Sequence, residues 1–363
     1  MTTETDAATG ALLGPPPTKG HLSVARVLDG WYVACRSREL GEKPLAITVL
    51  GTPLALFRGE GGRPGAVLDR CPHRNFPLSQ GHVLDSGALQ CGYHGWQFDG
   101  RGTCRTVPGL LGEAPDAPAR RVPAHAAREA QGFVWVWGRS DAEPKGEPFH
   151  VPCLDDPRYV AVERTFDFDC TLHAALENAL DVPHTAFLHR GRFRGGDPSE
   201  LEAVRRRLPG GGLEVQYLGE RRRPGDAKPR LDRPPVEHWD RFFLPAVAQV
   251  EYRDGERSHL LATILHTPIH DTLTRAWFVQ CIRLPLPKWL VGSYVARKVD
   301  QVLRQDRDAL RVQTESIRRF GGERYASTEL DLMGPEILRM LKQAERGLTV
   351  DEAVPERRVR FRA

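Results

Sequence analysis

The chain has 363 residues, enough for two domains, and its 40% hydrophobic and 27% charged residues are ordinary for a folded protein with a sizeable core. The net charge of +4 is small for this length, and the basic residues are scattered among acidic ones, which argues against a nucleic-acid partner. No apolar stretch approaches the ~18–20 residues of a membrane span, and the first twenty residues lack the basic start and apolar core of a secretory signal.

Residues 1–22 are expected to form a disordered arm, because small polar residues and prolines cannot bury enough surface to fix the chain. The seven cysteines are odd in number and mostly isolated, so they do not indicate a disulfide framework. A reducing cytoplasm is therefore the expected location, and cysteine pairs found there usually indicate metal binding or catalysis.

From about Leu28 to Gly138 the sequence is typical of short strands separated by turn residues. Strands are expected at 46–50, 53–58 and 133–137. Gly51-Thr52 lies between the first two and is expected to form a hairpin turn. The stretch 140–152, rich in Pro, Gly and charge, is expected to be a linker.

After the linker, helical and strand-like patterns mix. Ala and Leu at helical spacing predict a helix over 171–180, which Pro183 should end. The segment 191–235 is polar and rich in Gly and Pro, so it is expected to be irregular, with Arg205–Arg207 in a solvated loop. The remaining expected elements are strands at 242–252, 259–267 and 275–282 and helices at 291–317 and 335–346. The prediction is an all-β module followed by an α+β domain.

Two cysteines and two histidines form a C-x-H…C-x-x-H pattern at Cys71, His73, Cys91 and His94. Each short pair can come from one tight loop, so that two loops close on a metal from opposite sides. If the metal is a two-iron, two-sulfur cluster, the thiolates suit one iron and the neutral imidazoles suit the other. The alternative is a structural zinc site, although classical zinc spacings pair Cys with Cys and His with His.

The sequences CPHR at 71–74 and CGYHGW at 91–96 resemble the Rieske cluster signature of the ring-hydroxylating oxygenases, in their alpha (catalytic oxygenase) subunits. The resemblance implies that Cys71 and Cys91 bind one iron of a [2Fe-2S] cluster. It also implies that His73 and His94 bind the other iron.

The chain departs from this family directly after CPHR. The family usually has small residues there, and this chain has Asn75-Phe76. The departure leaves the four implied ligands in place and concerns the packing of the loop and its docking surface.

Residues 177–189 read ENALDVPHTAFLH and carry a second candidate metal motif. On a helix, Asp181 and His184 are three residues apart and so face the same side. His189 lies one turn farther on, after the break expected at Pro183. Two histidines and one distant carboxylate form the facial triad of non-haem Fe(II) oxygenases, which leaves positions open for O₂ and substrate. Taken alone, an H-x₄-H pair is more often two ordinary surface or capping histidines.

The pattern N-x-x-D-x-x-H-x₄-H resembles the mononuclear iron segment of the same oxygenase family. The resemblance implies that His184 and His189 bind iron. It implies that Asp181 is the electron bridge, through a hydrogen bond toward a Rieske histidine of a neighbouring subunit, and that Asn178 lies just outside the ligands. A ligand imidazole commonly donates its other N–H to a carboxylate, which agrees with the role of Asp181.

The third iron ligand must be a carboxylate from elsewhere in the chain. Residues 305–313 resemble the family's Q/E-D-x-x-x-L-x-x-Q stretch, in which the Asp binds iron, so Asp306 is the expected ligand and Asp308 is the alternative. Without the resemblance, both would be solvated helix acids among arginines. His266 and His270 are four residues apart, but this spacing converges on a helix and not on a strand, so both are expected to be structural or pocket-lining.

The resemblance implies an enzyme, the terminal component of a Rieske non-haem iron monooxygenase or dioxygenase. O₂ activated at a mononuclear Fe(II) would hydroxylate, or oxidatively demethylate, a small aromatic or polycyclic substrate. The chain lacks a dinucleotide-binding fingerprint and a plant-type ferredoxin cysteine run, so it is expected to receive electrons from NAD(P)H through a separate reductase, a ferredoxin or both. The length and the 305–313 stretch favour a monooxygenase or demethylase over a ring dioxygenase.

The implied architecture is α+β, with an all-β Rieske domain over 23–150 and a catalytic domain over 151–363. The catalytic domain is expected to have a curved antiparallel sheet covered by helices (helix-grip or START-like), in a head-to-tail homotrimer. Two other classes stay open: a Rieske electron-transfer protein with an inactive second iron site, and a zinc-binding interaction module.

Overall fold

A computed structural model describes residues 21–111, 116–189, 200–221, 235–256, 258–284, 288–350 and 355–362. Of the arm expected over 1–22, all but the last two residues lie outside the described residues. The described chain divides into two compact units, one formed by residues 27–150 and the other by residues 21–26 together with the chain from Val151 onward.

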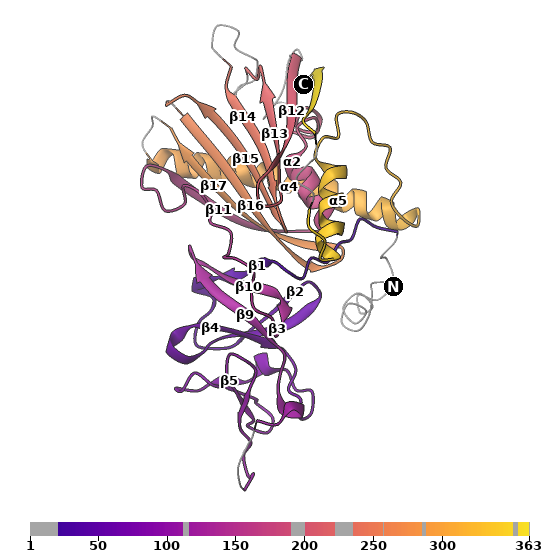
Figure 1. Ribbon diagram of the computed structural model, residues 1–363. Helices are drawn as coiled ribbons and strands as arrows, with labels where there is room; N and C mark the ends of the chain where they lie inside the picture. The colour runs from indigo at the N-terminus through magenta and orange to yellow at the C-terminus, as the bar shows by residue number, and fades with distance from the viewer. Residues whose placement is uncertain are drawn as a thin grey trace. The chain divides into compact units, whose positions relative to one another are not determined.

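The first unit contains two antiparallel sheets (Figure 1). The six-stranded sheet has the spatial order β1 (Trp31–Arg36), β10 (Phe133–Ser140), β9 (Ala124–Ala130), β4 (Pro64–Leu68), β3 (Thr52–Arg58) and β2 (Leu45–Val49). The four-stranded sheet has the order β5 (His82–Val83), β6 (Leu89–Gln90), β7 (Gln97–Phe98) and β8 (Cys104–Thr106). The all-β character expected for this part of the chain is confirmed.

The expected hairpin between the second and third strands is present, but its turn lies one residue earlier. Val49 pairs with Thr52, so the two turn residues are Leu50 and Gly51. Both have positive φ, of 52° and 77°, as a two-residue turn that matches strand twist requires. Thr52 is the first residue of β3, where a β-branched side chain packs well.

A buried cluster of apolar side chains in the first unit surrounds the two motif cysteines. Phe57 and Val67, from β3 and β4, pack with Leu89 and Phe98, from the small sheet. Cys71 and Cys91 are members of the same cluster. The loops that carry the C-x-H and C-x-x-H motifs are therefore anchored in a close-packed core.

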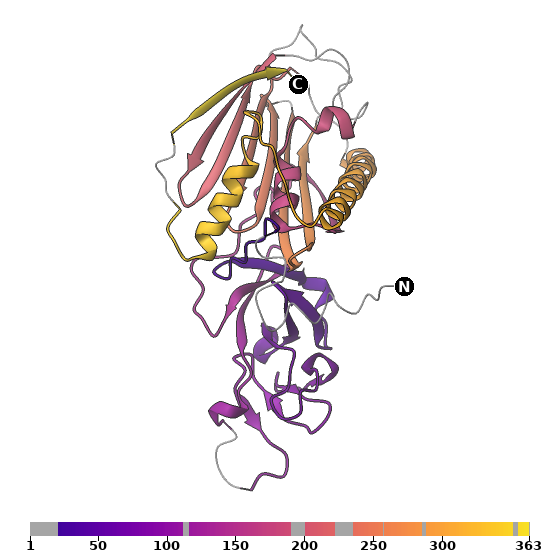
Figure 2. The same ribbon diagram turned by 90° about the vertical axis from the view of Figure 1, so that its right-hand side faces the viewer.

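The second unit is built on one antiparallel sheet of eight strands. Their order is β11 (Val160–Phe168), β17 (Leu273–Arg283), β16 (Ser258–His270), β15 (Val247–Asp254), β14 (Glu237–Phe243), β13 (Gly212–Leu218), β12 (Glu200–Leu208) and β18 (Arg357–Arg362). The helices are α2 (Leu172–Leu180), α3 (Thr185–Leu188), α4 (Lys288–Arg319) and α5 (Gly334–Glu345). Helix α2 packs on β14 to β17 and contacts both α4 and α5, and α4 packs along β11 (Figures 1 and 2). The expected antiparallel sheet covered by helices is confirmed.

Helix α2 begins and ends where its sequence predicts. The Thr171 hydroxyl accepts a hydrogen bond from the N–H of Ala174 at 3.1 Å and so caps the first turn. Leu172, Leu176 and Leu180 are buried on one side of the helix. The helix ends at Asp181, with Pro183 shortly after it.

Three expectations for the second unit are wrong. The segment 191–235 is not irregular throughout, because it contains β12 and β13, in which buried Leu213, Val215 and Tyr217 alternate with less buried residues. The run Arg205–Arg207 belongs to β12, and the side chain of Arg207 is only 6% exposed beside Glu336. An ion pair with Glu336 of α5 allows Arg207 to be buried, whereas Arg206 pairs with Glu356 and remains 37% exposed. The strand expected at 242–252 is two strands, the end of β14 and most of β15.

Residues 21–26 pack on the second unit, although the first unit follows them in the chain. Arg26 forms a two-point ion pair with Asp271 at 3.0 and 3.1 Å, and its N–H donates to Glu345 at 3.0 Å. The Ser23 hydroxyl donates to Glu323 at 2.9 Å. Among the described residues, no helix is both long and apolar enough to cross a membrane.

Candidate metal centres

The two loops that carry the Cys and His motifs have the same main-chain hydrogen bonds. In the first loop, the N–H of Cys71 donates to the carbonyl of Phe76 and the N–H of Asn75 donates to the carbonyl of Cys71, both at 2.9 Å. In the second loop, residues 91–96, the same bonds join residues at the same spacing, at 2.8 and 3.0 Å. Each cysteine is therefore held at the base of a tight loop by its own backbone.

The fifth residue of each loop has a positive φ, 60° for Asn75 and 72° for Gly95. Asn tolerates this left-handed conformation better than most residues with a side chain, and Gly adopts it freely. The Asn75 side chain accepts a hydrogen bond from Nε of Arg70 at 2.7 Å. Asn75, half of the departure from the family pattern, thus suits the conformation that the loop requires.

The motif cysteines are a buried pair of thiols. Cys71 is 1% exposed and Cys91 is 2% exposed. Burial, together with the adjacent Cys91, raises the pKa of the Cys71 thiol to about 11, and backbone N–H groups of His73 and Arg74 offset part of the rise. A metal must therefore displace the thiol protons when it binds here.

The rings of the two motif histidines are in contact with each other. The ring centroids of His73 and His94 are 4.4 Å apart, and the Trp96 ring stacks on His73 at 4.9 Å. Nδ1 of His73 is buried and has no hydrogen-bond partner among the described residues, as expected of a nitrogen that binds a metal. Two thiols and two imidazoles from facing loops fit a Rieske [2Fe-2S] cluster.

In the second unit, His184, His189 and Asp306 come together from a short helix and a long one. One ligand atom of each lies within 4.8 Å of the others. Nε2 of His189 is 3.1 Å from Oδ1 of Asp306, and Nε2 of His184 is 3.7 Å from the same oxygen. His184 and His189 flank α3, and Asp306 lies on α4. Two imidazole nitrogens and one carboxylate oxygen at one point fit the facial-triad ligand set of Fe(II).

The residues next to this group fix its orientation. Oδ2 of Asp181 lies 3.1 Å from Nδ1 of His184, and Oε1 of Gln305 lies 3.1 Å from Nδ1 of His189. The Asn178 side-chain amide donates to Oδ1 of Asp306 at 3.4 Å. Contacts of this kind hold each imidazole with Nε2 toward the metal position. Gln305, the first residue of the 305–313 stretch, was not predicted to have a role of its own.

The other acid and histidines that were considered lie elsewhere. The side chain of Asp308 is 60% exposed and pairs with Arg307. His266 is buried on β16, where the carbonyl of Ala246 lies 3.1 Å from Nδ1. His270, also on β16, is half-buried, and its ring nitrogen accepts a hydrogen bond from the N–H of Thr272.

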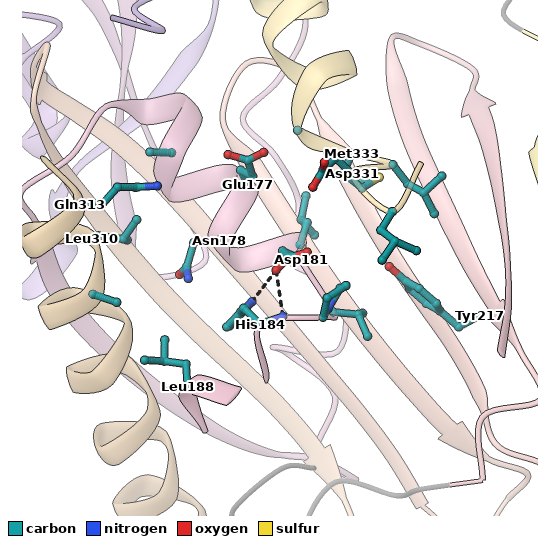
Figure 3. A pocket seen from close by; sticks show the side chains of 18 residues that line it. Glu177, Asn178, Asp181, His184, Leu188, Tyr217, Leu310, Gln313, Asp331 and Met333 are labelled. Carbon is teal, nitrogen blue, oxygen red and sulfur yellow. Dashed lines mark hydrogen bonds and ion pairs between the residues drawn. The ribbon is translucent and has the colours of Figure 1, made fainter. Parts of the chain in front are cut away.

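A cavity of about 390 Å³ lies beside the three-residue group (Figure 3). It is lined by His184, Asp181 and Asn178, by Leu310 and Gln313 of the 305–313 stretch, and by Tyr217 from β13. Met333 and Asp331, from the chain leading into α5, close another side. Tyr217, Asp331 and Met333 could not be predicted as lining residues, because no motif links these positions to the iron segment.

Glu177 also lines the cavity, one turn before Asp181 on α2. Burial raises the pKa of its carboxyl to about 7, and the negative charges of Asp181, Asp331 and Glu323 add to the rise. The cavity wall therefore holds a carboxyl group that is partly protonated near neutral pH.

Comparison with known protein families decides the affiliation of the chain. Residues 30–114 match the Rieske [2Fe-2S] domain. Residues 168–347 match the vanillate O-demethylase oxygenase C-terminal domain. This chain belongs to the Rieske non-haem iron oxygenases. The Rieske match also excludes the zinc-binding module as an account of the first motif.

Individual proteins similar to this Rieske oxygenase were found by sequence and by structure. It is 38% identical over 195 residues to the oxygenase component of dicamba O-demethylase from Stenotrophomonas maltophilia, covering 53% of this chain and 55% of that protein. It is 33% identical over 162 residues to the vanillate O-demethylase oxygenase subunit of a Pseudomonas strain, covering 44% of each. The aligned part of the chain thus spans about half the length of these relatives. The crystal structure of dicamba monooxygenase bound to 3,6-dichlorosalicylic acid shares the fold, with a TM-score of 0.72 at 24% identity over 89% of this chain and 98% of that one.

Proposed function

We propose that this Rieske oxygenase is a terminal oxygenase component that hydroxylates or oxidatively demethylates a small aromatic or polycyclic compound. The observation that carries the proposal is the convergence of His184, His189 and Asp306 in the second unit. An electron carrier without oxygenase activity would have no need for two histidines and a carboxylate directed at one point beside a cavity. The relatives named as O-demethylases make removal of an O-methyl group the first reaction to test.

In this proposal, Cys71, His73, Cys91 and His94 hold the [2Fe-2S] cluster, and His184, His189 and Asp306 hold Fe(II). The cluster supplies single electrons, and the Fe(II) site supplies the place where O₂ is reduced next to the substrate. For an aryl methyl ether the overall reaction is R–OCH₃ + O₂ + 2e⁻ + 2H⁺ → R–OH + HCHO + H₂O. The electrons come from NAD(P)H through a separate reductase, a ferredoxin or both.

The residues around the iron ligands have separate tasks. Asp181 and Gln305 orient the imidazoles of His184 and His189, each through a contact at 3.1 Å to Nδ1. Asn178 holds Oδ1 of Asp306 from the α2 side. Leu310 and Leu188 present apolar surface in the adjoining cavity, where they exclude water.

We further propose that the chain acts in the cytoplasm as a homotrimer, with Asp181 as the electron bridge to the cluster of a neighbouring subunit. Asp181 is suited to this role for two reasons. Its carboxylate contacts the proposed iron ligand His184, and the residue also lines the cavity, from which a docked neighbouring subunit could approach it. All seven cysteines are free, in agreement with a reducing compartment.

The test begins with anaerobic purification and a count of iron and acid-labile sulfide. We expect about three irons and two sulfides per chain, with a Rieske-type EPR signal after reduction. A panel of methoxylated aromatic acids, including vanillate and dicamba, is then incubated with NADH and a surrogate reductase, and formaldehyde is measured. If the chain holds only two irons and addition of Fe(II) does not raise this number, the oxygenase proposal is wrong. The chain would then be a Rieske electron-transfer protein with an inactive second iron site.

A further inference from the structure

Phe76, the second residue of the departure from the family pattern, bridges the two cluster loops. It ends the first loop, and its ring lies against Gly92 of the second loop. A Cβ at position 92 would be only 3.3 Å from Cε1 of Phe76, so the glycine allows this close approach. Phe76 also packs against the buried cluster that contains Cys71 and Cys91. The ring is therefore fixed from two sides.

Tyr93 extends this contact to a motif histidine. Its ring centroid lies 5.8 Å from that of Phe76 and 3.9 Å from that of His94. Tyr93 is nevertheless 60% exposed. An exposed aromatic side chain is ordinarily free to change rotamer, and here the fixed Phe76 ring supports it against His94.

The position of these rings has an electrostatic consequence. Uptake of one electron adds negative charge to a centre that already has two thiolates. Water stabilises added charge better than apolar rings do, so a ring that excludes water from one side of the centre disfavours the reduced state. Solvent exposure is one of the factors that set the potential of iron–sulfur clusters.

We propose that Phe76 holds Tyr93 over His94 as an apolar cover that lowers the reduction potential of the cluster. The inference rests on the proposed binding of a [2Fe-2S] cluster by the motif residues. Phe76 acts through Tyr93 and is a positioning residue. A lower potential would restrict which electron donors can reduce the cluster.

The test compares reduction potentials in the full-length protein with its cluster bound. In Phe76→Ala and Tyr93→Ala, we expect the equilibrium between the cluster and a one-electron dye mediator to move about threefold toward the reduced cluster, roughly half of the 59 mV that a tenfold change represents. Tyr93→Phe keeps the ring and should leave the potential unchanged, which separates the cover from any effect of the hydroxyl. Leu111→Ala removes a 97% exposed side chain from the same unit and should also have no effect.

A second measurement reports the approach of water directly. In D₂O, electron spin echo of the reduced cluster should show deeper deuterium modulation in Tyr93→Ala than in the parent protein or Tyr93→Phe. If Phe76→Ala loses iron because the loops separate, the exposed Tyr93 variants decide the question. If Tyr93→Ala keeps its cluster and has the same reduction potential and deuterium modulation as the parent protein, the proposed cover is wrong but the proposed function stands. If the parent protein itself gives no Rieske signal, the proposed function is wrong as well.

Discussion

Oδ2 of Asp181 accepts hydrogen bonds from both the backbone N–H and Nδ1 of His184, at 3.0 and 3.1 Å. A carboxylate can only accept, so the proton of the neutral imidazole is on Nδ1 and the lone pair is on Nε2. The helix that ends at Asp181 therefore selects the histidine nitrogen that faces Asp306. The spacing of three residues between Asp181 and His184 allows one carboxylate to contact both the backbone and the imidazole of His184, and so to fix the orientation of the ring.

Replacement of Asp306 should empty the mononuclear site and leave the cluster intact. Asp306→Asn removes the negative charge with almost no change in shape, so we expect about one of three irons to be lost while acid-labile sulfide is retained. Asp308→Asn is the matched control, two residues away on the same helix and 60% exposed. Iron and sulfide analysis of both variants is the measurement. Equal iron contents would exclude Asp306 as a ligand.

Gln305 should affect the affinity for Fe(II) without being a ligand. Gln305→Leu removes the acceptor at Nδ1 of His189, and loss of such a contact typically costs about 10–100-fold in metal affinity. Titration of the iron-depleted protein with Fe(II) measures this change. Gln301→Leu, at an exposed position one turn earlier on α4, should bind Fe(II) as the parent does. An unchanged affinity in Gln305→Leu would show that His189 is oriented by other contacts.

The ion pair between Arg207 and Glu336 should be worth far more to stability than a surface pair. Its side chains are 6% and 12% exposed, and removal of one partner from such a pair costs about 3–5 kcal/mol. We expect Glu336→Ala to lower the free energy of unfolding in urea by about 3 kcal/mol. Glu356→Ala, which breaks a pair with Arg206 at 39% and 37% exposure, should leave the free energy of unfolding nearly unchanged, because solvent screens a pair this exposed. Similar losses in the two variants would contradict this assignment.

His266 should make stability depend on pH between about 6.5 and 4. Burial lowers the pKa of this imidazole to about 4 in the folded state, whereas an unfolded chain has a value near 6.5. The unfolded state therefore binds the proton first, and stability falls as the pH drops through this window, by roughly 3 kcal/mol in total. Urea unfolding of the parent and His266→Gln at pH 7 and pH 4.5 measures the effect. The variant should lose less stability than the parent on acidification.

Elements with a strong pattern could be predicted from the sequence. The helices α2, α4 and α5 were expected within a few residues of their observed bounds, because their apolar residues recur at helical spacing. Strands β16 and β17 could also be predicted, because each contains a long run rich in apolar and β-branched residues. Such runs are typical of strands in the interior of a sheet, which is where both lie.

The strands β11, β12 and β18 carry several charged residues each, and this composition resembles that of a solvated segment. Arg164 of β11 pairs with Asp300 on α4, and Arg207 of β12 pairs with Glu336 on α5. When the partner of a charged residue lies more than a hundred positions away, the residues next to it in the sequence do not reveal that it belongs to a strand packed under a helix.

The candidate site divides in the same way. The Cys and His residues of the first motif, and His184 and His189 of the second, occur at short, fixed spacings, whereas Asp306 lies more than a hundred residues away and was expected only from the family resemblance. The contact of Gln305 with His189 depends on how α4 lies across the end of α2. Tyr217 and Asp331 reach the cavity from β13 and from the chain before α5. These relationships are set by tertiary packing, which short-range patterns do not encode.

The contacts of residues 21–26 have a consequence for biosynthesis. The second unit combines residues 21–26 with the chain from Val151 onward, and residues 27–150 of the first unit lie between these two segments in the sequence. Arg26 leaves the ribosome early, but its partner Asp271 emerges only after the whole Rieske unit has been translated. The Rieske unit can therefore fold, and receive its cluster, while the segment before it still waits for the sheet on which it will pack. A fragment that starts at Val151 would lack this segment permanently.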